Sequence, residues 1–327
     1  MRLNDCVVYS YDGAVGSGAE VIETASLLSI ECADTLDTLD DLLLSSMSFL
    51  DHERIGIVGL GAIGGSLALA LGSRAPVLAW SLDAADREAA RRAGIKLCPD
   101  GTWAAAMAEA TAVVIAVPID EVASVVRELL PQVSEGCVVM HASSLQRRQA
   151  VGLSEPEFHR VLGTHPIAGS ERSGFGAANP TIFRDATVRA EARAGAEARA
   201  RIEAVWRGAG IARLVWDDAS THDAVMAWIS HLPQVTGTAL AAVLAAHDVS
   251  PDETGPGARD ATRLAASDFA LWGPILERAP RETTEAVRHL TSTLAALADA
   301  LEARDQESIA RTWAQARSWR ARSEGRT

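Results

Sequence analysis

Lysine is almost missing from this sequence, and its other charges are unevenly divided. The 327 residues contain one lysine, Lys96; lysine and arginine together number 30 against 43 aspartates and glutamates, which gives a net charge of −13 at pH 7. A chain with this charge repels nucleic acid and anionic lipid, so we expect neither as a partner. An anionic protein that binds an anionic small molecule must then place its arginines locally, at the site.

Cysteine pairs, targeting signals and long apolar runs are also missing. The amino-terminal sequence lacks the basic start and apolar stretch of a signal peptide, and we see no run of membrane-spanning length. The cysteines include no CxxC and no histidine at metal-ligand spacing, so we expect reduced thiols and no metal site. They are Cys6, Cys32, Cys98 and Cys137. These absences predict a cytoplasmic protein without a membrane span.

The pattern along the chain predicts two domains behind an N-terminal extension. Residues 1–50 form the extension, to which the sequence assigns no role. Short apolar, β-branched runs alternate with Ala-rich helical stretches in residues 51–190, which predicts an α/β domain with a doubly wound parallel sheet of the Rossmann type. These runs are RIGIVGL, VLAW, TAVVIAVP, CVVMHAS and RVLGTHP. Beyond about residue 190 the β runs stop, and residues 191–327 predict an all-α domain.

A glycine pattern marks the first turn of the predicted sheet. Gly59, Gly61 and Gly64 form GxGxxG between a strand and a helix. The first glycine permits the tight turn, the second lets a pyrophosphate approach the backbone, and the third lets helix and strand pack closely. Ala62 and Ile63 begin the helix, whose free N–H groups would hold the phosphates. We expect a nicotinamide dinucleotide here.

The end of the second predicted strand favours NAD over NADP. Ser81 stands where an acidic residue often holds the ribose hydroxyls, and Asp83 follows two residues later. The Asp83 carboxylate would repel a 2′-phosphate, and no arginine follows immediately. NAD is therefore the expected cofactor, with NADP as the alternative. Val117 and Pro118, after the TAVVIAVP strand, are expected to line the same site.

Polar loops follow the later strands, where the carboxyl ends of parallel strands form a ligand crevice. HASSLQ (141–146) contains Ser144, and GTHPIAGSERSG (163–174) contains His165. A lone histidine is more often structural, but its position at this crevice makes His165 a candidate for catalysis.

These motifs resemble the prephenate/arogenate dehydrogenase family of tyrosine biosynthesis. The resemblance covers about residues 54–320 and rests on GLGAIGGSLA, VPID, GTHPIAGSERSG, SHLPQ and RDATRLAASDFALW, in that order. It implies oxidative decarboxylation of a cyclohexadienyl dicarboxylate: hydride passes to the nicotinamide, carbon dioxide leaves, and the ring becomes aromatic. It also implies a homodimer formed through the helical domain.

The resemblance assigns roles to individual residues. His165 matches the family histidine that acts as a general base on the ring hydroxyl, and Ser144 matches the serine that orients both groups; without the resemblance Ser144 is an ordinary helix N-cap. Arg263 matches the arginine that grips a substrate carboxylate, for which a guanidinium fork is suited. Asp260, which shares a helix face with Arg263, forms with Glu171 the charged gate at the substrate entrance.

Further residues are expected around the substrate. His231 matches a pocket-lining histidine of the helical domain, and Pro233 would kink its helix. Arg172 and Arg259 could contact the second carboxylate, and they rank below Arg263. Gln234 stands where the family motif commonly ends in histidine.

Departures from the family pattern leave the substrate open. The family commonly has DxGSxK around the serine, whereas this chain has HASSLQ, so His141 replaces the acid and Gln146 replaces the lysine. An amino analogue, 4-amino-4-deoxyprephenate, is therefore an alternative substrate to prephenate and arogenate.

Two other functions are compatible with a Rossmann domain followed by a helical domain. A β-hydroxyacid or 6-phosphogluconate-type dehydrogenase needs a catalytic lysine in its second domain, and Lys96 lies in the first. A non-catalytic dinucleotide-binding regulator would share the fold, although it would need neither His165 nor Arg263.

Overall fold

The computed structural model describes residues 50, 53–169 and 172–324. All of them belong to one compact unit, Leu42–Thr327. The extension, with Cys6 and Cys32, and the predicted gate residue Glu171 lie outside the described residues. Cys98 and Cys137 are buried free thiols, and burial raises the pKa of each to about 11.

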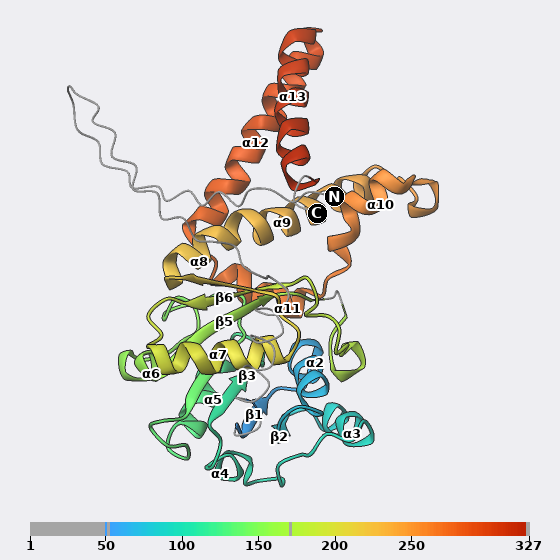
Figure 1. Ribbon diagram of the computed structural model, residues 1–327. Helices are drawn as coiled ribbons and strands as arrows, with labels where there is room; N and C mark the ends of the chain where they lie inside the picture. Colours follow the sequence, from blue (N-terminus) through green and yellow to red (C-terminus); the bar gives the residue numbers. More distant parts are fainter. Residues whose placement is uncertain (1–49, 51–52, 170–171, 325–327) are drawn as a thin grey trace, which may run out of the picture. The chain divides into compact units, whose positions relative to one another are not determined.

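A seven-stranded sheet forms the centre of the first domain (Figure 1). Its order is β2-β1-β3-β4-β5-β6-β7, and the first five strands in this order run parallel. They confirm the five predicted runs, and β1, β3 and β4 are buried along their whole length because helices cover both faces. Their bounds are β1 Ile55–Val58, β2 Val77–Trp80, β3 Ala112–Ile115, β4 Val138–His141 and β5 Val161–Ile167.

The helices of this domain pack on the two faces of the sheet. On one face α2 and α7 bury leucines, Ile202 and Trp206 against β1 and β4; on the other, α4 and α5 bury Trp103 and valines against β3. This is the predicted Rossmann arrangement. The helices are α2 Ala62–Leu71, α3 Ala84–Arg92, α4 Trp103–Ala106, α5 Val122–Leu129, α6 Glu155–Arg160 and α7 Ala196–Gly208.

The prediction that strands end near residue 190 is wrong. Strand β6 (Thr187–Glu191) pairs antiparallel with β5, and β7 (Arg213–Asp217) pairs parallel with β6. The sequence of β7, RLVWD, is too short and too polar to stand out between two helical stretches, because it lies at the sheet edge and is only half-buried. The sheet domain therefore extends to residue 217, and the helical domain begins there.

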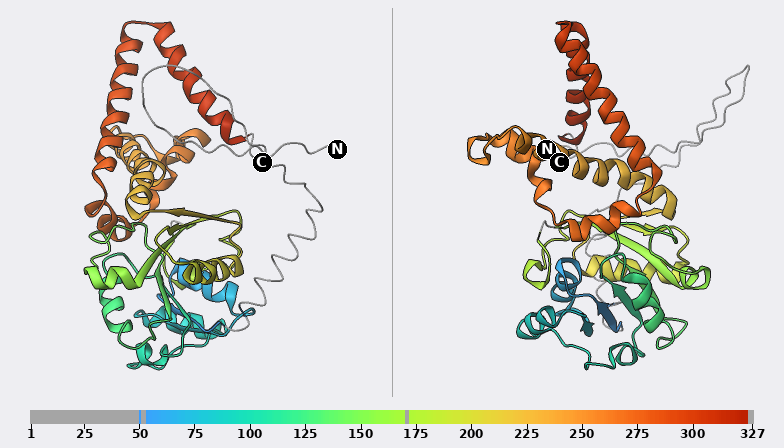
Figure 2. Two further views of the ribbon diagram at one scale, coloured as in Figure 1. Left: turned by 60° about the vertical axis from the view of Figure 1, so that its left-hand side comes forward. Right: turned by 180° about the vertical axis from the view of Figure 1, so that it is seen from behind.

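The helical domain follows the predicted stretches (Figures 1 and 2). A π-helical turn, Ala227–His231, joins α8 to α9, and Pro233 lies at the second position of α9. Because proline has no N–H, the deviation before Pro233 fits the expected kink. The helices are α8 Ala219–Met226, α9 Leu232–Ala246, α10 Pro256–Thr262, α11 Phe269–Glu277, α12 Arg281–Glu302 and α13 Gln306–Glu324.

One prediction about membranes needs correction. The continuous helical segment Ala219–Ala246 has 28 residues and is long and apolar enough to cross a membrane by length and composition. Our statement that no run reaches that length is therefore wrong. The same segment holds buried polar side chains, among them His222, Asp223 and His231, which bond to other parts of the protein. One such helix is by itself weak evidence for a membrane span.

Several large apolar side chains of the helical domain remain exposed in the single chain. Trp206 on α7 of the first domain is buried, whereas Trp313 and Trp319 on α13 are 60% and 66% exposed. Leu294 and Leu301 on α12 are similarly exposed. Helices α12 and α13 contact each other and run antiparallel (Figure 2). This surface is suited to a partner of apolar character.

Candidate active site

The glycine loop between β1 and α2 has the geometry of a phosphate cradle. Gly59 has φ +93°, and a Cβ there would lie 2.5 Å from the Ala116 carbonyl oxygen. A Cβ on Gly64 would lie 1.9 Å from the Gly59 carbonyl oxygen. A Cβ on Gly61 would meet no atom within 4 Å. The first and third glycines therefore serve packing, and the second keeps open space above the backbone.

The open space suits a dinucleotide. Gly61 is the N-cap residue of α2 and contributes no side-chain cap, so the first N–H groups of the helix have no partner within it. These N–H groups and the positive end of the helix dipole favour a phosphate. Gly61, Ala62 and Ile63 face the space and would hold the pyrophosphate.

Acidic side chains lie at the end of β2. Ser81 is buried, and Asp83 caps α3 by accepting hydrogen bonds from the N–H groups of Ala85 (2.7 Å) and Asp86 (3.0 Å). Asp86, which the sequence reasoning missed, accepts a hydrogen bond from the Phe175 N–H (2.7 Å). Its link to the loop after β5 has no sequence signal because it joins residues far apart in the chain.

One cavity of about 560 Å³ joins the glycine loop to the predicted catalytic residues. His165 and Ser144 line it together with Gly59, Gly61 and Val117. The remaining predicted cofactor residues on its wall are Ala62, Ile63, Ser81, Asp83 and Pro118. Ser144 lies in a bend that leads into no helix, so its interpretation as an N-cap is wrong. The cavity therefore brings together candidate catalytic and cofactor-binding groups from separate strands.

His165 is neutral in this environment. Burial lowers the pKa of its imidazole well below the ordinary value of 6.5, and the neighbouring histidines and Arg189 lower it further. Its Nδ1 lies 3.1 Å from Nε2 of His222, which the sequence reasoning missed together with Asp223. Both belong to α8, and nothing in the local pattern distinguishes a His-Asp pair there. A neutral imidazole at the cavity can accept a proton.

The helical domain closes one side of the cavity. Leu271, Pro274 and Ile275 of α11 line it, and Ile275 is buried. The sequence motif RDATRLAASDFALW covers only the start of this helix, and none of the three side chains was singled out from the sequence. Their apolar atoms would exclude water from bound ligands.

Arg263 and its neighbours lie apart from this cavity. Arg263 begins a 3₁₀ turn, Arg263–Ala266, and is exposed, as are Arg259 and Asp260 on α10. None of the three lines the cavity, and within the described residues none of their side chains makes a hydrogen bond or ion pair. Because α10 ends at Thr262, Asp260 and Arg263 do not share one regular helix face as predicted. Arg172, in contrast, lines the cavity.

His231 and Gln234 are buried within the helical domain. His231 Nδ1 lies 2.8 Å from the Thr283 hydroxyl, its Nε2 has no hydrogen-bond partner among the described residues, and burial lowers its pKa to about 4. Gln234 donates to the Leu264 carbonyl (2.8 Å). In this arrangement Gln234 supports the turn that carries Arg263, and it does not line the cavity.

His141 and Gln146, the two departures from the family pattern, are both buried in the protein interior. His141 is fully buried on β4, where burial lowers its pKa to about 3 and keeps it neutral. Gln146 is fully buried and donates to the Arg189 carbonyl (2.8 Å). Neither side chain lines the cavity, so neither supplies a charge to it directly.

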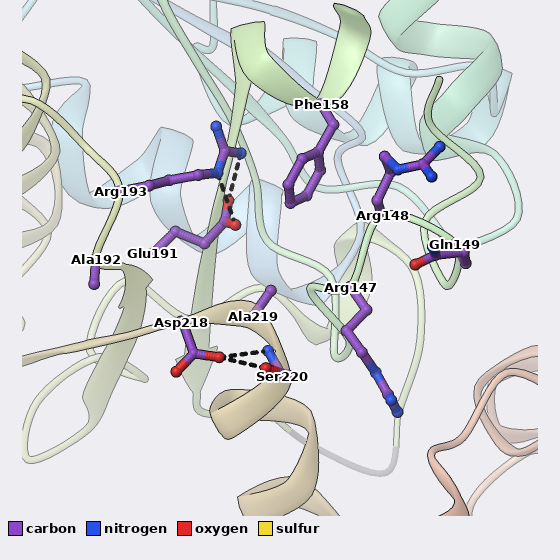
Figure 3. A pocket seen from close by; sticks show the side chains of 10 residues that line it. All are labelled: Arg147, Arg148, Gln149, Phe158, Glu191, Ala192, Arg193, Asp218, Ala219 and Ser220. Carbon is purple, nitrogen blue, oxygen red and sulfur yellow. Dashed lines mark hydrogen bonds and ion pairs between the residues drawn. The ribbon is translucent and has the colours of Figure 1, made fainter. Parts of the chain in front are cut away.

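A second cavity of about 340 Å³ lies beside α6 and α8 (Figure 3). Its three guanidinium groups are paired with carboxylates: Arg193 with Glu191 (2.7 Å), Arg147 with Asp223 (3.1 Å) and Arg148 with Glu155 (3.5 Å). The balanced charges give it no preference for an anion. Within the described residues no group of three or more histidine, cysteine, aspartate or glutamate side chains could hold a metal ion.

Two family models match consecutive parts of the chain. "Prephenate dehydrogenase, nucleotide-binding domain" matches residues 67–213, and "Prephenate dehydrogenase, dimerization domain" matches residues 218–315. Their junction falls next to the end of β7, in agreement with the end of the sheet.

Similar proteins carry related names. The prephenate dehydrogenase of Lactococcus lactis is 28% identical over 278 residues, which cover 79% of this chain and 73% of that protein. The cyclohexadienyl dehydrogenase of Zymomonas mobilis is 28% identical over 272 residues, covering 79% and 91%. The structure of prephenate dehydrogenase from A. aeolicus in complex with hydroxyphenyl propionate and NAD+ has the same fold, with a TM-score of 0.74 and 22% identity over 84% of this chain and 99% of that one.

The sheet domain followed by the helical domain agrees with the order of the two family models along the chain. The resemblance drawn from the sequence motifs is thereby confirmed, and with it the assignment to oxidoreductases that carry a nucleotide-binding and a dimerization domain. This chain belongs to the prephenate dehydrogenase family.

Proposed function

We propose that this enzyme oxidatively decarboxylates a prephenate-type cyclohexadienyl substrate with NAD as hydride acceptor. The observation that carries the proposal is the single cavity shared by the glycine loop, Ser144 and His165. It would hold a dinucleotide and a small ring side by side, with a neutral imidazole at the reacting end. Homologues named prephenate and cyclohexadienyl dehydrogenase support the choice of substrate class.

His165 acts as the general base in this proposal. Bound NAD supplies the hydride acceptor. As the hydride leaves the ring carbon, the hydroxyl proton on that carbon passes to the imidazole. Carbon dioxide departs, the ring becomes an aromatic phenolate, and the imidazole returns the proton to its oxygen. Ser144 lies on the same cavity wall and holds the ring hydroxyl against His165. The low pKa of His165 keeps the base unprotonated at neutral pH.

Arg263 is proposed to bind a substrate carboxylate, with Arg259 and Arg172 as weaker candidates for the second. Asp260 and Glu171 would form a charged gate, and His231 would line the ring pocket. Arg263 is exposed in the single chain, so this role requires either movement of the turn Arg263–Ala266 or closure by a second copy.

We further propose a cytoplasmic homodimer formed through the helical domain. The exposed tryptophans Trp313 and Trp319, with Leu294 and Leu301, supply an apolar surface. The match to a dimerization domain supports it. Analytical ultracentrifugation tests it: we expect a dimer, and a monomer at micromolar concentration contradicts it.

A substrate panel tests the proposed reaction. Purified enzyme is mixed with prephenate, arogenate or 4-amino-4-deoxyprephenate and with NAD or NADP, and nicotinamide reduction is followed by absorbance. We expect turnover with one of the two ring-hydroxyl substrates and a preference for NAD. Turnover only with the amino substrate would assign the alternative pathway, and failure with all three would contradict the proposal.

A further inference from the structure

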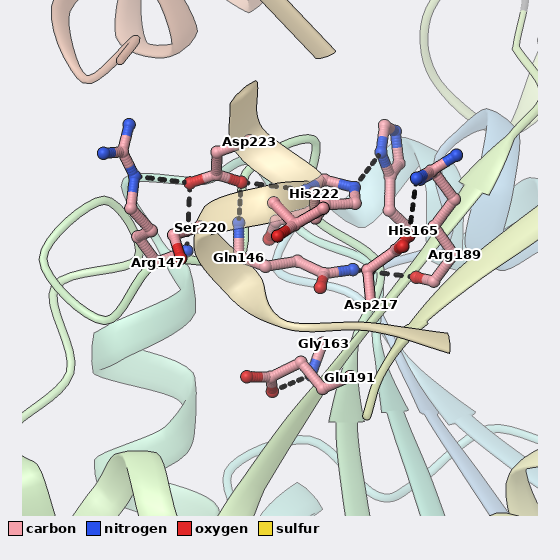
Figure 4. Close-up of polar contacts among 12 residues, drawn as sticks. Gln146, Arg147, Gly163, His165, Arg189, Glu191, Asp217, Ser220, His222 and Asp223 are labelled. Carbon is pink, nitrogen blue, oxygen red and sulfur yellow. Dashed lines mark hydrogen bonds and ion pairs between the residues drawn. The ribbon is translucent and has the colours of Figure 1, made fainter. Parts of the chain in front are cut away.

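Behind His165 lies a chain of buried polar side chains that the proposed reaction does not use. His222 and Asp223, at the middle of α8, are each 0% exposed. His222 Nε2 lies 3.1 Å from His165 Nδ1, and His222 Nδ1 lies 2.8 Å from Asp223 Oδ1 (Figure 4). We call these three residues the histidine relay.

Asp223 fixes the charge at the inner end of the histidine relay. Its Oδ1 accepts a hydrogen bond from the Gln146 N–H (2.7 Å), and its Oδ2 accepts two from Arg147, from the backbone N–H and from Nε (both 3.1 Å). Burial alone would raise the pKa of the Asp223 carboxyl, but the hydrogen bonds from His222 and these N–H groups outweigh it and hold the pKa below its usual range. Asp223 is therefore a carboxylate that only accepts hydrogen bonds.

The carboxylate sets the direction of every hydrogen bond in the histidine relay. Because Asp223 can only accept, His222 Nδ1 must carry the proton between them. With a single proton on His222, its Nε2 is bare and can only accept, so His165 Nδ1 donates to it. Neutral His165 is left with a bare Nε2, and no described residue donates to that atom.

The geometry points to His222 and Asp223 as positioning residues that hold His165 in the Nδ1–H tautomer, with Nε2 free to take the substrate proton. This inference rests on the proposed function and deepens it. It also explains why His222 and Asp223 are buried, because burying polar side chains costs stability and neither adds to the apolar core.

The histidine relay would also offset the charge that forms on His165. The other charged or titratable groups that face this imidazole are His141, His231 and Arg189, none of which is an anion. Arg189 is paired with Asp217 (2.6 Å). A proton on Nε2 would therefore be unfavourable unless the negative charge of Asp223 acts on it through His222, as the carboxylate does in Ser-His-Asp triads.

Paired substitutions of His222 separate polarity from shape. In His222→Gln the side-chain oxygen can accept from His165 while its NH2 donates to Asp223, so the direction of both bonds is kept. In His222→Leu both bonds are lost, although Asp223 keeps its three N–H donors and the helix retains a side chain of similar size. We expect kcat to fall about 100-fold or more in His222→Leu and to stay within about tenfold of wild type in His222→Gln, with little change in KM.

Asp223→Asn tests the tautomer itself. An amide presents one oxygen, and its NH2 must face either His222 or the Arg147 donors. Facing Arg147 opposes two N–H donors, whereas facing His222 opposes one, the N–H of Gln146. We therefore expect the NH2 to face His222, which must then carry its proton on Nε2. That reverses the next bond and moves the proton of His165 to Nε2, where it blocks the base.

The nitrogen NMR spectrum of histidine-labelled enzyme reads the tautomer without turnover. The His165 signals are identified by their loss in His165→Asn. In wild type we expect Nδ1 of His165 to be protonated and Nε2 to be bare, and in Asp223→Asn we expect the reverse. His159→Asn, which changes an exposed histidine on α6, is the matched control and should alter neither the tautomer nor the rate.

Each outcome decides the inference. A protonated Nε2 on His165 in the wild-type enzyme overturns it, whatever the variants do. Equal losses in His222→Gln and His222→Leu, with unchanged circular dichroism, overturn the requirement for bond polarity. If no cyclohexadienyl substrate is turned over, the proposed function fails, while the NMR result still stands for or against the histidine relay.

Discussion

Two glycines of the loop after β1 should separate folding from cofactor binding. In Gly64→Ala the new methyl group would lie 1.9 Å from the Gly59 carbonyl oxygen and 3.1 Å from the Ala116 side chain. Helix α2 must then move away from β1, which we expect to cost about 3 kcal/mol or more. For a chain of this size that lowers Tm by about 5 °C.

Gly61→Ala should behave in the opposite way. Its methyl group meets no atom within 4 Å, so the fold accepts it. Alanine is a poorer N-cap than glycine, and the cost to stability should stay within about 1 kcal/mol. The methyl group would stand where the pyrophosphate approaches. Loss of one charge-assisted hydrogen bond, about 1.5–3 kcal/mol, would raise the Kd for NAD by about 10- to 100-fold.

Differential scanning fluorimetry and calorimetric titration with NAD measure both quantities on each variant. The reasoning is refuted if Gly61→Ala binds NAD as tightly as wild type, because the open space above the loop would then not be the pyrophosphate site. It is also refuted if Gly64→Ala keeps the wild-type Tm, because the close contact between helix and strand would then not limit the fold.

Three further predictions follow from the site. Arg263→Ala should raise KM by about 30-fold or more through loss of a charge-assisted contact, measured by initial rates with Arg259→Ala as the comparison; an unaltered KM removes Arg263 from the site. Asp83→Asn keeps the cap on α3 but removes a charge beside the cofactor, so the ratio of kcat/KM for NADP to that for NAD should rise about tenfold; a constant ratio places the ribose elsewhere. Lowering the pH from 7 to 5 should destabilise the fold, because His141 and His231 have folded pKa values of about 3 and 4, below the ordinary 6.5. The stabilisation from keeping these histidines neutral is fully present above pH 6.5 and is lost as the pH falls towards the folded pKa values. By pH 5 each histidine should have lowered the free energy of unfolding by about 2 kcal/mol. Equal free energies of unfolding in urea at pH 7 and pH 5 would contradict this.

The parallel part of the sheet could be predicted because its strands are buried on both faces and therefore appear as uninterrupted apolar runs. Strand β7 could not, since Arg213 to Asp217 lie at an edge where no burial imposes a pattern. Pairing at the sheet edge depends on contacts between distant segments, and these leave little trace in a local sequence.

The candidate site likewise has a part that could be predicted from the sequence and a part that could not. His165, Ser144 and Gly61 follow strand ends, and the topology of a parallel sheet brings such positions together, so their meeting could be predicted. Asp86 and His222 reach their partners across 89 and 57 residues, and no local pattern encodes those bonds. The family resemblance supplied a role for Arg263, but its exposure depends on the turn Arg263–Ala266 and on any second copy.

The most direct test of the account is hydride transfer in a single turnover with His165→Asn. Enzyme saturated with NAD is mixed with the best substrate of the panel in a stopped-flow instrument, and His159→Asn serves as the control on an exposed histidine. We predict that His165→Asn lowers the rate of NAD reduction by about 100-fold or more while its Kd for NAD stays within about threefold of wild type. An unchanged rate of reduction in His165→Asn would contradict the role of this imidazole as the base.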